Sequence, residues 1–390
     1  MNPIAFEETK TLYTTQFGGS PEVVAWGPGR VNLIGEHTDY NQGLVLPMAV
    51  NRGIRICGKV RTDGKVILYS GDYKDRVEFD TQLPQKDPDH AWANYFKGVL
   101  VQYQKKNPSF PGCQAVIQGD LPQGAGLSSS AAFEVTTASF LEKIGGTVWH
   151  DMELIQAAQA AENQFVGVQC GIMDPFVSYL GRENTALMID CQDLAYEWVS
   201  VPTGVKIVVC NTGVKRELAV SAYNQRRQEC EAAVTLLHAA LPYVHSLRDL
   251  SSPDFERYQG ILPNLILKRC RHVVSENQRV RDMVRALEQG DLVTAGNLMA
   301  QSHESLREDY EVSCGELNIL CTLAPQNDAA YGARMMGGGF GGCTVNLVRE
   351  DGVDVFLKDM AEGYRKKAQL ELESYIFTAS PGAKFFSDRE

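Results

Sequence analysis

The amino-acid sequence predicts an α+β protein built from two domains. Short apolar and β-branched runs follow one another over residues 44–80, and such runs are typical of strands. Apolar residues at helical spacing predict three long helices in the second half, over residues 218–240, 269–289 and 292–307. A chain of 390 residues is long enough for two or three domains. We place the boundary near Ser200, which predicts domains of residues 1–200 and 201–390.

Composition narrows the class of protein. Hydrophobic residues make up 44% of the chain and charged residues 22%, so a large core can be buried. A net charge of −11 disfavours nucleic acid and anionic membranes as partners. Ten cysteines without a Cys-x-x-Cys pair suit reduced thiols. The acidic start does not resemble a signal peptide, and no run reaches the length of a membrane span, so we expect a cytoplasmic protein. We also expect a monomer.

The first 80 residues predict one helix and a series of strands. A helix over residues 4–17 leads into a strand at 23–26, and Gly27-Pro28-Gly29 then predicts a tight turn before Arg30. Further strands are expected at residues 44–46, 54–57, 66–69 and 77–79. The segment Thr62-Asp63-Gly64-Lys65 predicts a hairpin between two of them.

Ionisable side chains are dense just after the first strand. Glu36, His37 and Asp39 lie within four residues and offer donors and acceptors for hydroxyl groups. The alternative is an ordinary polar turn between two strands. Arg30 weakens that alternative, because a permanently charged guanidinium is suited to stabilising a phosphoryl group during transfer.

A glycine- and serine-rich turn precedes a helical pattern that stops at Gly145-Gly146. The turn contains Gly124, Gly126 and three serines, residues 128–130. Free N–H groups and the positive end of the helix dipole at such a turn attract anions, and the serine hydroxyls can reach phosphate oxygens or hydrated Mg²⁺. The turn lacks the Walker A lysine and the third glycine of a dinucleotide fingerprint. The alternative is a flexible turn that only caps the helix.

Three further side chains have two interpretations each. Glu162 lies on the apolar stripe of a helix that we expect from an N-cap at Asp151 to about Val166, so it either binds a cation or reaches solvent at the stripe's edge. Asp174 stands among apolar neighbours as a turn former or a general base. Trp92 is either core or a platform for an adenine ring.

A second glycine-rich turn lies near the C-terminal end of the chain. Residues 332–343 contain five glycines in six positions and precede a predicted strand at 344–348. Glycines this dense let the backbone approach another backbone or a ligand closely. A flexible hinge is the alternative.

Taken together, three segments resemble the GHMP kinase family and, within it, the galactokinase family. They are residues 29–41, 121–132 and 337–343, and the similarity extends over nearly the whole chain. The resemblance implies a two-domain fold, with an N-terminal ribosomal-protein-S5-like domain, a C-terminal ferredoxin-like α/β domain and the active site in the cleft between them. It implies ATP-dependent phosphorylation of D-galactose at the C1 hydroxyl, the first committed step of galactose catabolism.

The resemblance also implies where ATP and its metal bind. The ATP phosphates are expected on the loop formed by Gly124, Ala125, Gly126, Leu127, Ser128, Ser129 and Ser130. Ser70 and Trp92 are expected near the nucleotide. Ser130 and Glu162 are expected to hold Mg²⁺.

Sugar-binding and catalytic roles follow in the same way. The resemblance implies that Glu36, His37, Thr38, Asp39, Asp174 and Tyr223 bind the sugar. It makes Asp174 the base near the C1 hydroxyl and places Arg30 facing the phosphates. One departure concerns Pro175, where the family usually carries glutamine. A proline there predicts an extended or turn conformation for Asp174.

Three other functions remain open at this stage. The first is another sugar-1-kinase of the family, acting on N-acetylgalactosamine or arabinose. The second is a galactose- and ATP-binding regulator without chemistry, which the intact serines at 128–130 disfavour. The third is a kinase for mevalonate-like acids, whereas the hydroxyl-reading segment 36–39 fits a neutral sugar better.

Overall fold

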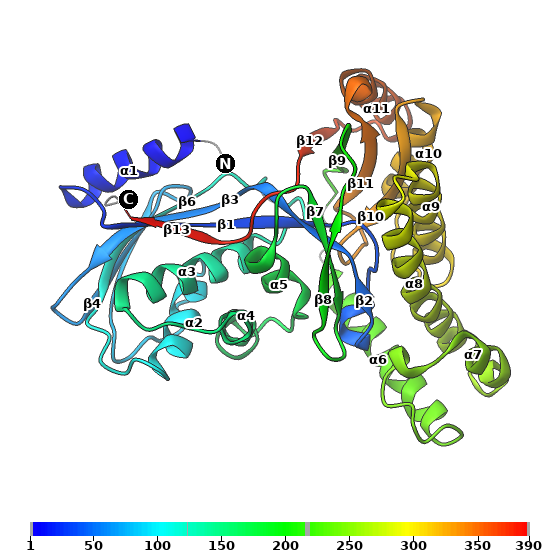
Figure 1. The fold of residues 1–390 in the computed structure, drawn as a ribbon, viewed down its shortest axis with the longest axis horizontal. Coiled ribbons are helices and arrows are strands. Elements are labelled where there is room, and N and C mark those ends of the chain that lie inside the picture. The colour runs from blue at the N-terminus through cyan, green and yellow to red at the C-terminus, as the bar shows by residue number, and fades with distance from the viewer. Residues whose placement is uncertain (1–2, 123, 215–218, 388–390) are drawn as a thin grey trace.

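The computed structural model describes residues 3–122, 124–214 and 219–387. Its described strands form sheets of six, four and three strands. Figure 1 shows the six-stranded sheet and its helices on one side of the molecule and most of the later helices on the other. Within these ranges, no helix combines the length and the apolar character needed to cross a bilayer.

The six-stranded sheet forms the first half of the fold. In spatial order its strands are β13 (Lys384–Ser387), β1 (Val23–Asn32), β3 (Pro47–Val60), β6 (Cys113–Gly119), β4 (Lys65–Ser70) and β5 (Asp75–Asp80). The β4–β6 pair is parallel and the others are antiparallel. The predicted hairpin at residues 62–65 is therefore wrong in its pairing. The turn does join β3 to β4, but β6 lies between them, because a local turn signal reverses the chain without choosing the strand's partner.

Helices cover both faces of this sheet. Helix α1 (Pro3–Phe17), expected at residues 4–17, lies on one face, where Tyr13 packs on the sheet. On the other face lie α2 (Ala93–Gln104), α3 (Ser129–Gly145) and α4 (Asp151–Ala160) (Figure 1). Phe96 and Phe140 are fully buried there in a large apolar cluster. The apolar stripe of α3 therefore fixes the helix that begins at the serine-rich turn against the sheet.

Strand β1 continues through the segment that predicted a tight turn. Gly27-Pro28-Gly29 belongs to the strand, and its pairing with β3 is irregular between Pro28 and Arg30. A Cβ on Gly29 would lie 2.6 Å from the Leu127 carbonyl oxygen. The glycine is needed for the close approach of the serine-rich turn to the strand, and not for a chain reversal.

The second half of the chain contains the four-stranded sheet and most of the later helices, whereas the three-stranded sheet is built from residues before 201. The four-stranded antiparallel sheet has the order β10 (Ala330–Met336), β11 (Cys343–Arg349), β9 (Val205–Asn211) and β12 (Glu373–Phe377). The three-stranded sheet has the order β2 (Leu44–Val45), β7 (Thr185–Asp190) and β8 (Tyr196–Ser200). The helices are α6 (Ala219–His238), α7 (Ser252–Tyr258), α8 (Asn264–Glu288), α9 (Leu292–Glu308), α10 (Gly315–Leu323) and α11 (Val353–Ala368).

The three long helices predicted here are confirmed as α6, α8 and α9, although residue 218 lies outside the described residues. The strand expected at 344–348 is part of β11. Strand β13 pairs with β1, so the last described residues belong to the first sheet. The proposed boundary near residue 200 stays a prediction.

A shared apolar cluster joins the two halves. Val31 of β1 and Leu46, just before β3, belong to one cluster with Val209, Val280 and Val345 from the second half. The segment that follows Arg30 therefore faces the four-stranded sheet and helix α8. The remaining described elements are short: α5 (Met173–Leu180), the π-helix η2 (Ala161–Val166) and the 3₁₀ helices η1 (Asp39–Asn41), η3 (Leu247–Asp249), η4 (Gln259–Ile261), η5 (Ala324–Gln326) and η6 (Glu350–Gly352).

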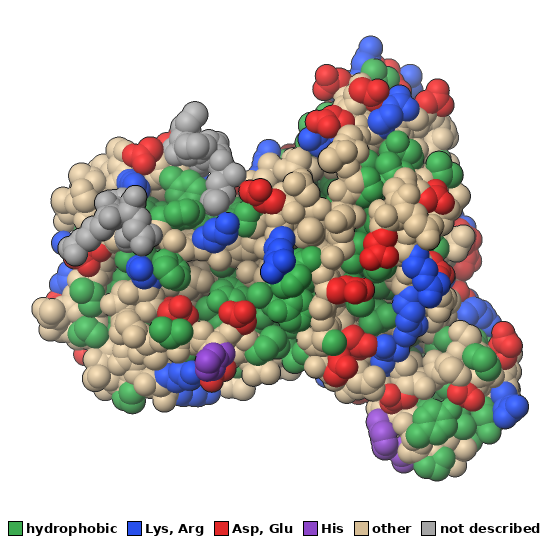
Figure 2. All heavy atoms as spheres, in the orientation of Figure 1, with side chains coloured by type: hydrophobic (Ala, Val, Ile, Leu, Met, Phe, Trp, Pro, Cys, Tyr) green, Lys and Arg blue, Asp and Glu red, His purple; other side chains and the backbone are tan. Residues whose placement is uncertain are grey.

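Acidic and basic side chains are interspersed on the face of the molecule seen in Figure 2. Side chains of both signs lie over each half in this view, and basic side chains form a run along the second half.

Candidate active site

Arg30 and Asp174 form a bidentate pair where the halves meet. The Arg30 Nε atom lies 2.7 Å from Asp174 Oδ1, and Nη2 lies 2.8 Å from Oδ2. Strand β1 carries the arginine, and the first turn of α5 carries the aspartate, 144 residues later. Burial opposes the arginine's charge, but Asp174 outweighs burial and raises the pKa of Arg30. The fork geometry fixes both oxygens of the carboxylate.

Asp174 occupies a helical position, contrary to the conformation expected before Pro175. The residue lies in the first turn of α5, and Pro175 follows it there. Proline is tolerated in a first helical turn, because the N–H groups of that turn have no partner inside the helix. The proline therefore does not remove a hydrogen bond of the helix.

The serine-rich turn contacts this pair. Arg30 Nη1 donates to the Gly126 carbonyl at 2.6 Å, and the Ser128 hydroxyl donates to Asp174 Oδ2. Gly124, Gly126 and Ser128 have φ of +72°, +66° and +54°, which is the left-handed region that favours glycine. Helix α3 begins directly after the turn, as the sequence predicts. Residue 123 lies outside the described residues.

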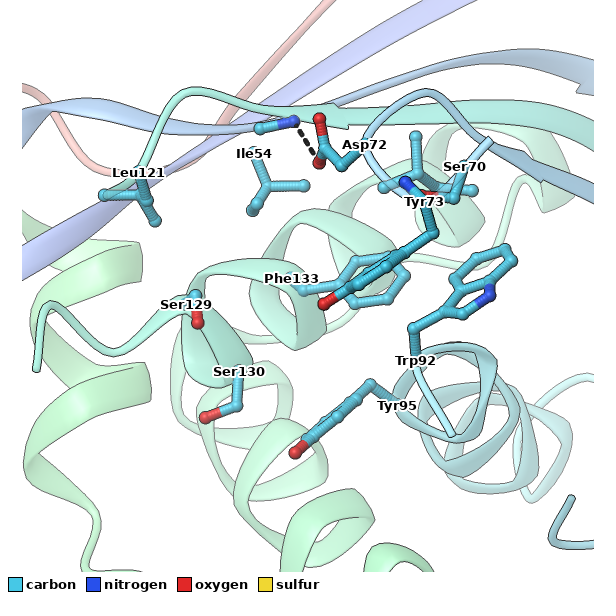
Figure 3. A pocket seen from close by; sticks show the side chains of 12 residues that line it. Ile54, Ser70, Asp72, Tyr73, Trp92, Tyr95, Leu121, Ser129, Ser130 and Phe133 are labelled. Carbon is cyan, nitrogen blue, oxygen red and sulfur yellow. Dashed lines mark hydrogen bonds between the residues drawn. The ribbon is translucent and has the colours of Figure 1, made fainter. Parts of the chain in front are cut away.

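A cavity of about 450 Å³ opens beside the start of α3. Ser70, Trp92, Ser129 and Ser130 line it, so four of the predicted nucleotide residues share one space. Figure 3 shows aromatic rings on one side of the cavity and Ser129 and Ser130 on the other. Apolar walls with a polar end suit a base joined to phosphates.

Two tyrosines of this cavity were not predicted as nucleotide contacts. Tyr73 stacks on Trp92 with ring centroids 6.5 Å apart and 20° between their planes, and Tyr95 lines the same wall. Trp92 is held by a hydrogen bond from Nε1 to Asp75 at 2.8 Å. Each tyrosine lies three residues after a predicted contact, Ser70 or Trp92, and this spacing was the available signal.

The segment 35–43 contains the predicted sugar-binding residues 36–39 and is here called the sugar loop for that prediction. Its residues are densely hydrogen-bonded. Glu36 is buried and accepts from the Gly337 N–H at 2.6 Å and from Asn32 Nδ2 at 2.8 Å, and Arg334 lies 3.3 Å away. The Thr38 hydroxyl is fully buried, 2.8 Å from the Gly35 carbonyl and 2.7 Å from the Leu44 carbonyl. The second glycine-rich turn thus contacts the sugar loop directly.

His37, Asp39 and Tyr223 lie close to one another and to Asp174. The ring centroids of His37 and Tyr223 lie 5.5 Å apart. The backbone φ of His37 is +63°. Burial, followed by repulsion from Asp174, raises the pKa of Asp39 to about 6. Burial and the charges of Asp39 and Asp174 also raise the pKa of Tyr223. The predicted sugar residues on the loop, Tyr223 and Asp174 therefore share one electrostatic environment.

Glu162 is buried, so the interpretation in which it reaches solvent is wrong. Helix α4 begins at Asp151, with His150 rather than Asp151 as its N-cap, and changes at Ala161 to the π-helix that carries Glu162. Such π-turns are frequent at functional sites. Burial raises the pKa of Glu162, and hydrogen bonds from Cys170 and Ser130 oppose that shift. A buried carboxylate beside a serine hydroxyl is an oxygen donor set that fits Mg²⁺.

Comparison with known proteins identifies the family. Residues 11–60 match the galactokinase galactose-binding signature, residues 94–182 the GHMP kinases N terminal domain and residues 283–366 the GHMP kinases C terminal model. A galactokinase of Chloroflexus aggregans is 44% identical over 378 residues, which cover 96% of this chain and 97% of that one. The chain belongs to the galactokinase family of GHMP kinases.

Other relatives of the family agree. A galactokinase of Haemophilus influenzae (strain PittEE) is 41% identical over 98% of this chain and 100% of its own length. The crystal structure of Lactococcus lactis galactokinase complexed with galactose superposes with a TM-score of 0.92 and 34% identity, over 97% of this chain and 99% of that one. The predicted α+β two-domain GHMP kinase fold is confirmed. Methanococcus jannaschii mevalonate kinase, at 16% identity and a TM-score of 0.67, shares the fold.

Proposed function

We propose that this chain transfers the γ-phosphoryl group of ATP to the C1 hydroxyl of D-galactose. The bidentate Arg30–Asp174 pair carries this proposal, because Ser128 ties it to the loop beside the nucleotide cavity while Asp39 and Tyr223 lie in the same electrostatic environment. Family membership and the galactose-binding signature support galactose as the sugar.

Asp174 acts on the attacking hydroxyl. A sugar hydroxyl is a weak nucleophile at neutral pH, so it needs a group that orients it and accepts its proton during attack on the γ-phosphorus. Arg30 and Ser128 hold both Asp174 oxygens in place. We infer that this positioning of the carboxylate contributes more to the rate than its proton affinity does.

The serine-rich turn and Arg30 act on the phosphates. Residues 124–130 present a backbone turn and hydroxyls at the start of α3, and Arg30 lies beside Gly126. Ser130 and Glu162 are the residues that would hold Mg²⁺, which neutralises charge on the nucleotide's phosphate oxygens when bound. Ser70 and Trp92, with Tyr73 and Tyr95, form the walls around the base.

The sugar loop and Tyr223 bind the sugar. Glu36, His37 and Asp39 supply acceptors and donors for its hydroxyls, and Tyr223 closes the site from α6. We propose that Thr38 acts indirectly, because its hydroxyl already lies between two backbone carbonyls that define the loop.

An ADP-release assay with ATP and a panel of sugars tests the proposal. Galactose should have the highest kcat/KM, above N-acetylgalactosamine, arabinose and mevalonate. Tight galactose and ATP binding without ADP release would indicate a regulator and contradict the proposal. A higher kcat/KM with another sugar would reassign the substrate within the family.

A further inference from the structure

Glu134, in the second turn of α3, is an unusual buried acid. Its side chain is 0% exposed, and among the described residues neither carboxylate oxygen has a hydrogen-bond partner. A buried polar group without a partner costs about 1–3 kcal/mol, and an ionised one costs more. The chain therefore carries a substantial penalty at this position.

Glu276 of α8 is a matched comparison, because both oxygens of its buried carboxylate accept hydrogen bonds. It is equally buried, yet it accepts from the Gly35 N–H at 2.9 Å, the Ser302 hydroxyl at 2.6 Å and Arg279 Nε at 2.6 Å. Glu276 holds the sugar loop in place, so its role is structural. Glu134 makes no comparable contact within the described part of the chain, which argues against a structural role.

The position of Glu134 points to the cation site. It lies four residues after Ser130 on the same helix, so both side chains lie on one face of α3. Repulsion from Glu162 and then Asp174 adds to burial in raising the pKa of Glu134. Tyr95 and Cys170 lie in the electrostatic field of both Glu134 and Glu162. The unpartnered carboxyl is therefore among the groups that surround Glu162.

We propose that Glu134 is a positioning residue of the divalent-cation site, accepting hydrogen bonds from water bound to the cation that Ser130 and Glu162 hold. The inference rests on the proposed function, which places the cation there. Mg²⁺ keeps several of its water ligands when it binds beside a nucleotide, and those waters are donors that a buried carboxylate can accept. Groups that orient a metal's ligands without touching the metal typically change its affinity 10–100-fold, by the general magnitude for such contacts.

Mn²⁺ titration followed by electron paramagnetic resonance tests this role directly. The protein is saturated with a non-hydrolysable ATP analogue, and free Mn²⁺ is measured as the metal is added. Glu134→Gln keeps the shape of the side chain and should weaken Mn²⁺ binding about 10-fold. Thr137→Val is the matched control, because Thr137 is also fully buried on α3 with an unpartnered hydroxyl. Its Mn²⁺ affinity should equal that of the unmodified chain.

Two further variants separate the possible outcomes. Glu162→Gln should lose most Mn²⁺ binding; if it binds Mn²⁺ normally, the cation site of the proposed function is wrong. If Glu162→Gln loses binding while Glu134→Gln binds normally, the role of Glu134 is overturned and the proposed function stands. Glu134→Leu removes the buried polar group, so it should raise the metal-free melting temperature and still weaken Mn²⁺ binding. Unchanged Mn²⁺ binding by this variant would also overturn the inference.

Discussion

The sugar loop and the serine-rich turn are held in place by different means. Helix α8 supports the sugar loop from far along the chain. His272 Nε2 lies 3.0 Å from the Glu36 carbonyl, Glu276 accepts from the Gly35 N–H at 2.9 Å, and Asn277 accepts from the N–H of Leu44, just after the loop, at 2.8 Å. The conformation of the sugar loop therefore depends on the second half of the protein.

The serine-rich turn has fewer long-range hydrogen bonds. Arg30 donates two of them, from its backbone N–H to the Leu127 carbonyl at 3.0 Å and from its side chain to the Gly126 carbonyl. The Ser128 hydroxyl donates another to Asp174. A Cβ at Gly126 would meet nothing within 4 Å. The sugar loop is therefore held in one conformation by contacts with distant segments. The serine-rich turn instead keeps open space beside the backbone of Gly126.

Asp174 lies where the two regions meet, so its substitution should have the largest effect. Asp174→Asn keeps the size of the side chain but removes the proton acceptor and half of the Arg30 pair. We expect kcat to fall about 10³-fold, by the magnitude of general-base catalysis. Galactose binding, measured by calorimetry, should survive. Near-normal turnover would remove Asp174 from the mechanism.

Arg334→Met, the next largest change, tests whether buried contacts from the second half hold the sugar loop in place. Arg334 is fully buried and donates to the carbonyls of Asn32 at 2.6 Å and Leu33 at 2.7 Å. Removing it leaves Glu36 buried without its cation, which should lower the free energy of unfolding by about 3–5 kcal/mol. Arg349→Met, at an exposed ion pair on the neighbouring strand, should change it by at most about 1 kcal/mol. Equal effects in urea denaturation would contradict the comparison.

Acid should destabilise the fold through three buried histidines around the sugar loop. Burial lowers the pKa of His37 to about 3 and those of His272 and His303 to about 4. Their stabilising contribution is complete above the unfolded value of about 6.5 and is lost as the pH falls toward those folded values. Asp39 acts oppositely, because its raised pKa of about 6 relieves an unfavourable charge as the pH falls.

The net change can be measured by urea denaturation at two pH values. When the pH falls from 7.5 to 5.5, each of the three histidines should lower the free energy of unfolding by about 1 kcal/mol, and Asp39 should raise it by about 1 kcal/mol. The net free energy of unfolding should therefore fall by about 2 kcal/mol. His245→Gln, at an exposed histidine, should leave this difference unchanged. A stability that rises toward pH 5.5 would exclude buried neutral histidines.

The smallest effect is expected in the nucleotide cavity. Trp92→Leu removes an aromatic surface, which by the usual energy of base stacking should cost about 1 kcal/mol, or about five-fold in the KM for ATP. The KM for galactose should not change, because the sugar loop is supported separately. Trp198→Leu, on strand β8 in the three-stranded sheet, is the control. A change in the galactose KM would show that the two regions are coupled.

Local sequence signals predicted the position of the serine-rich turn and of the helix that follows it. Glycines followed by serines and a helical pattern indicated the turn at 124–130, and the structure places it at the start of α3. The backbone conformation predicted at two positions was wrong. Arg30 lies in a strand rather than after a tight turn, and Asp174 is helical although Pro175 follows it. For Arg30, strand pairing outweighed a local turn preference. For Asp174, the first turn of a helix accommodates the proline that follows.

Residue types and their spacing were enough to establish the family, the serine-rich turn and the residues that could carry the chemistry, because turn chemistry and helical periodicity depend on near neighbours along the chain. Which carboxylate pairs with Arg30, which tyrosines line the cavity and which acid is buried without a partner emerged from folding alone. Those properties depend on burial and on contacts between distant segments. Asp174 binds Arg30 although 144 positions separate them in the sequence. The residues next to Glu134 in the sequence do not indicate that its side chain is buried.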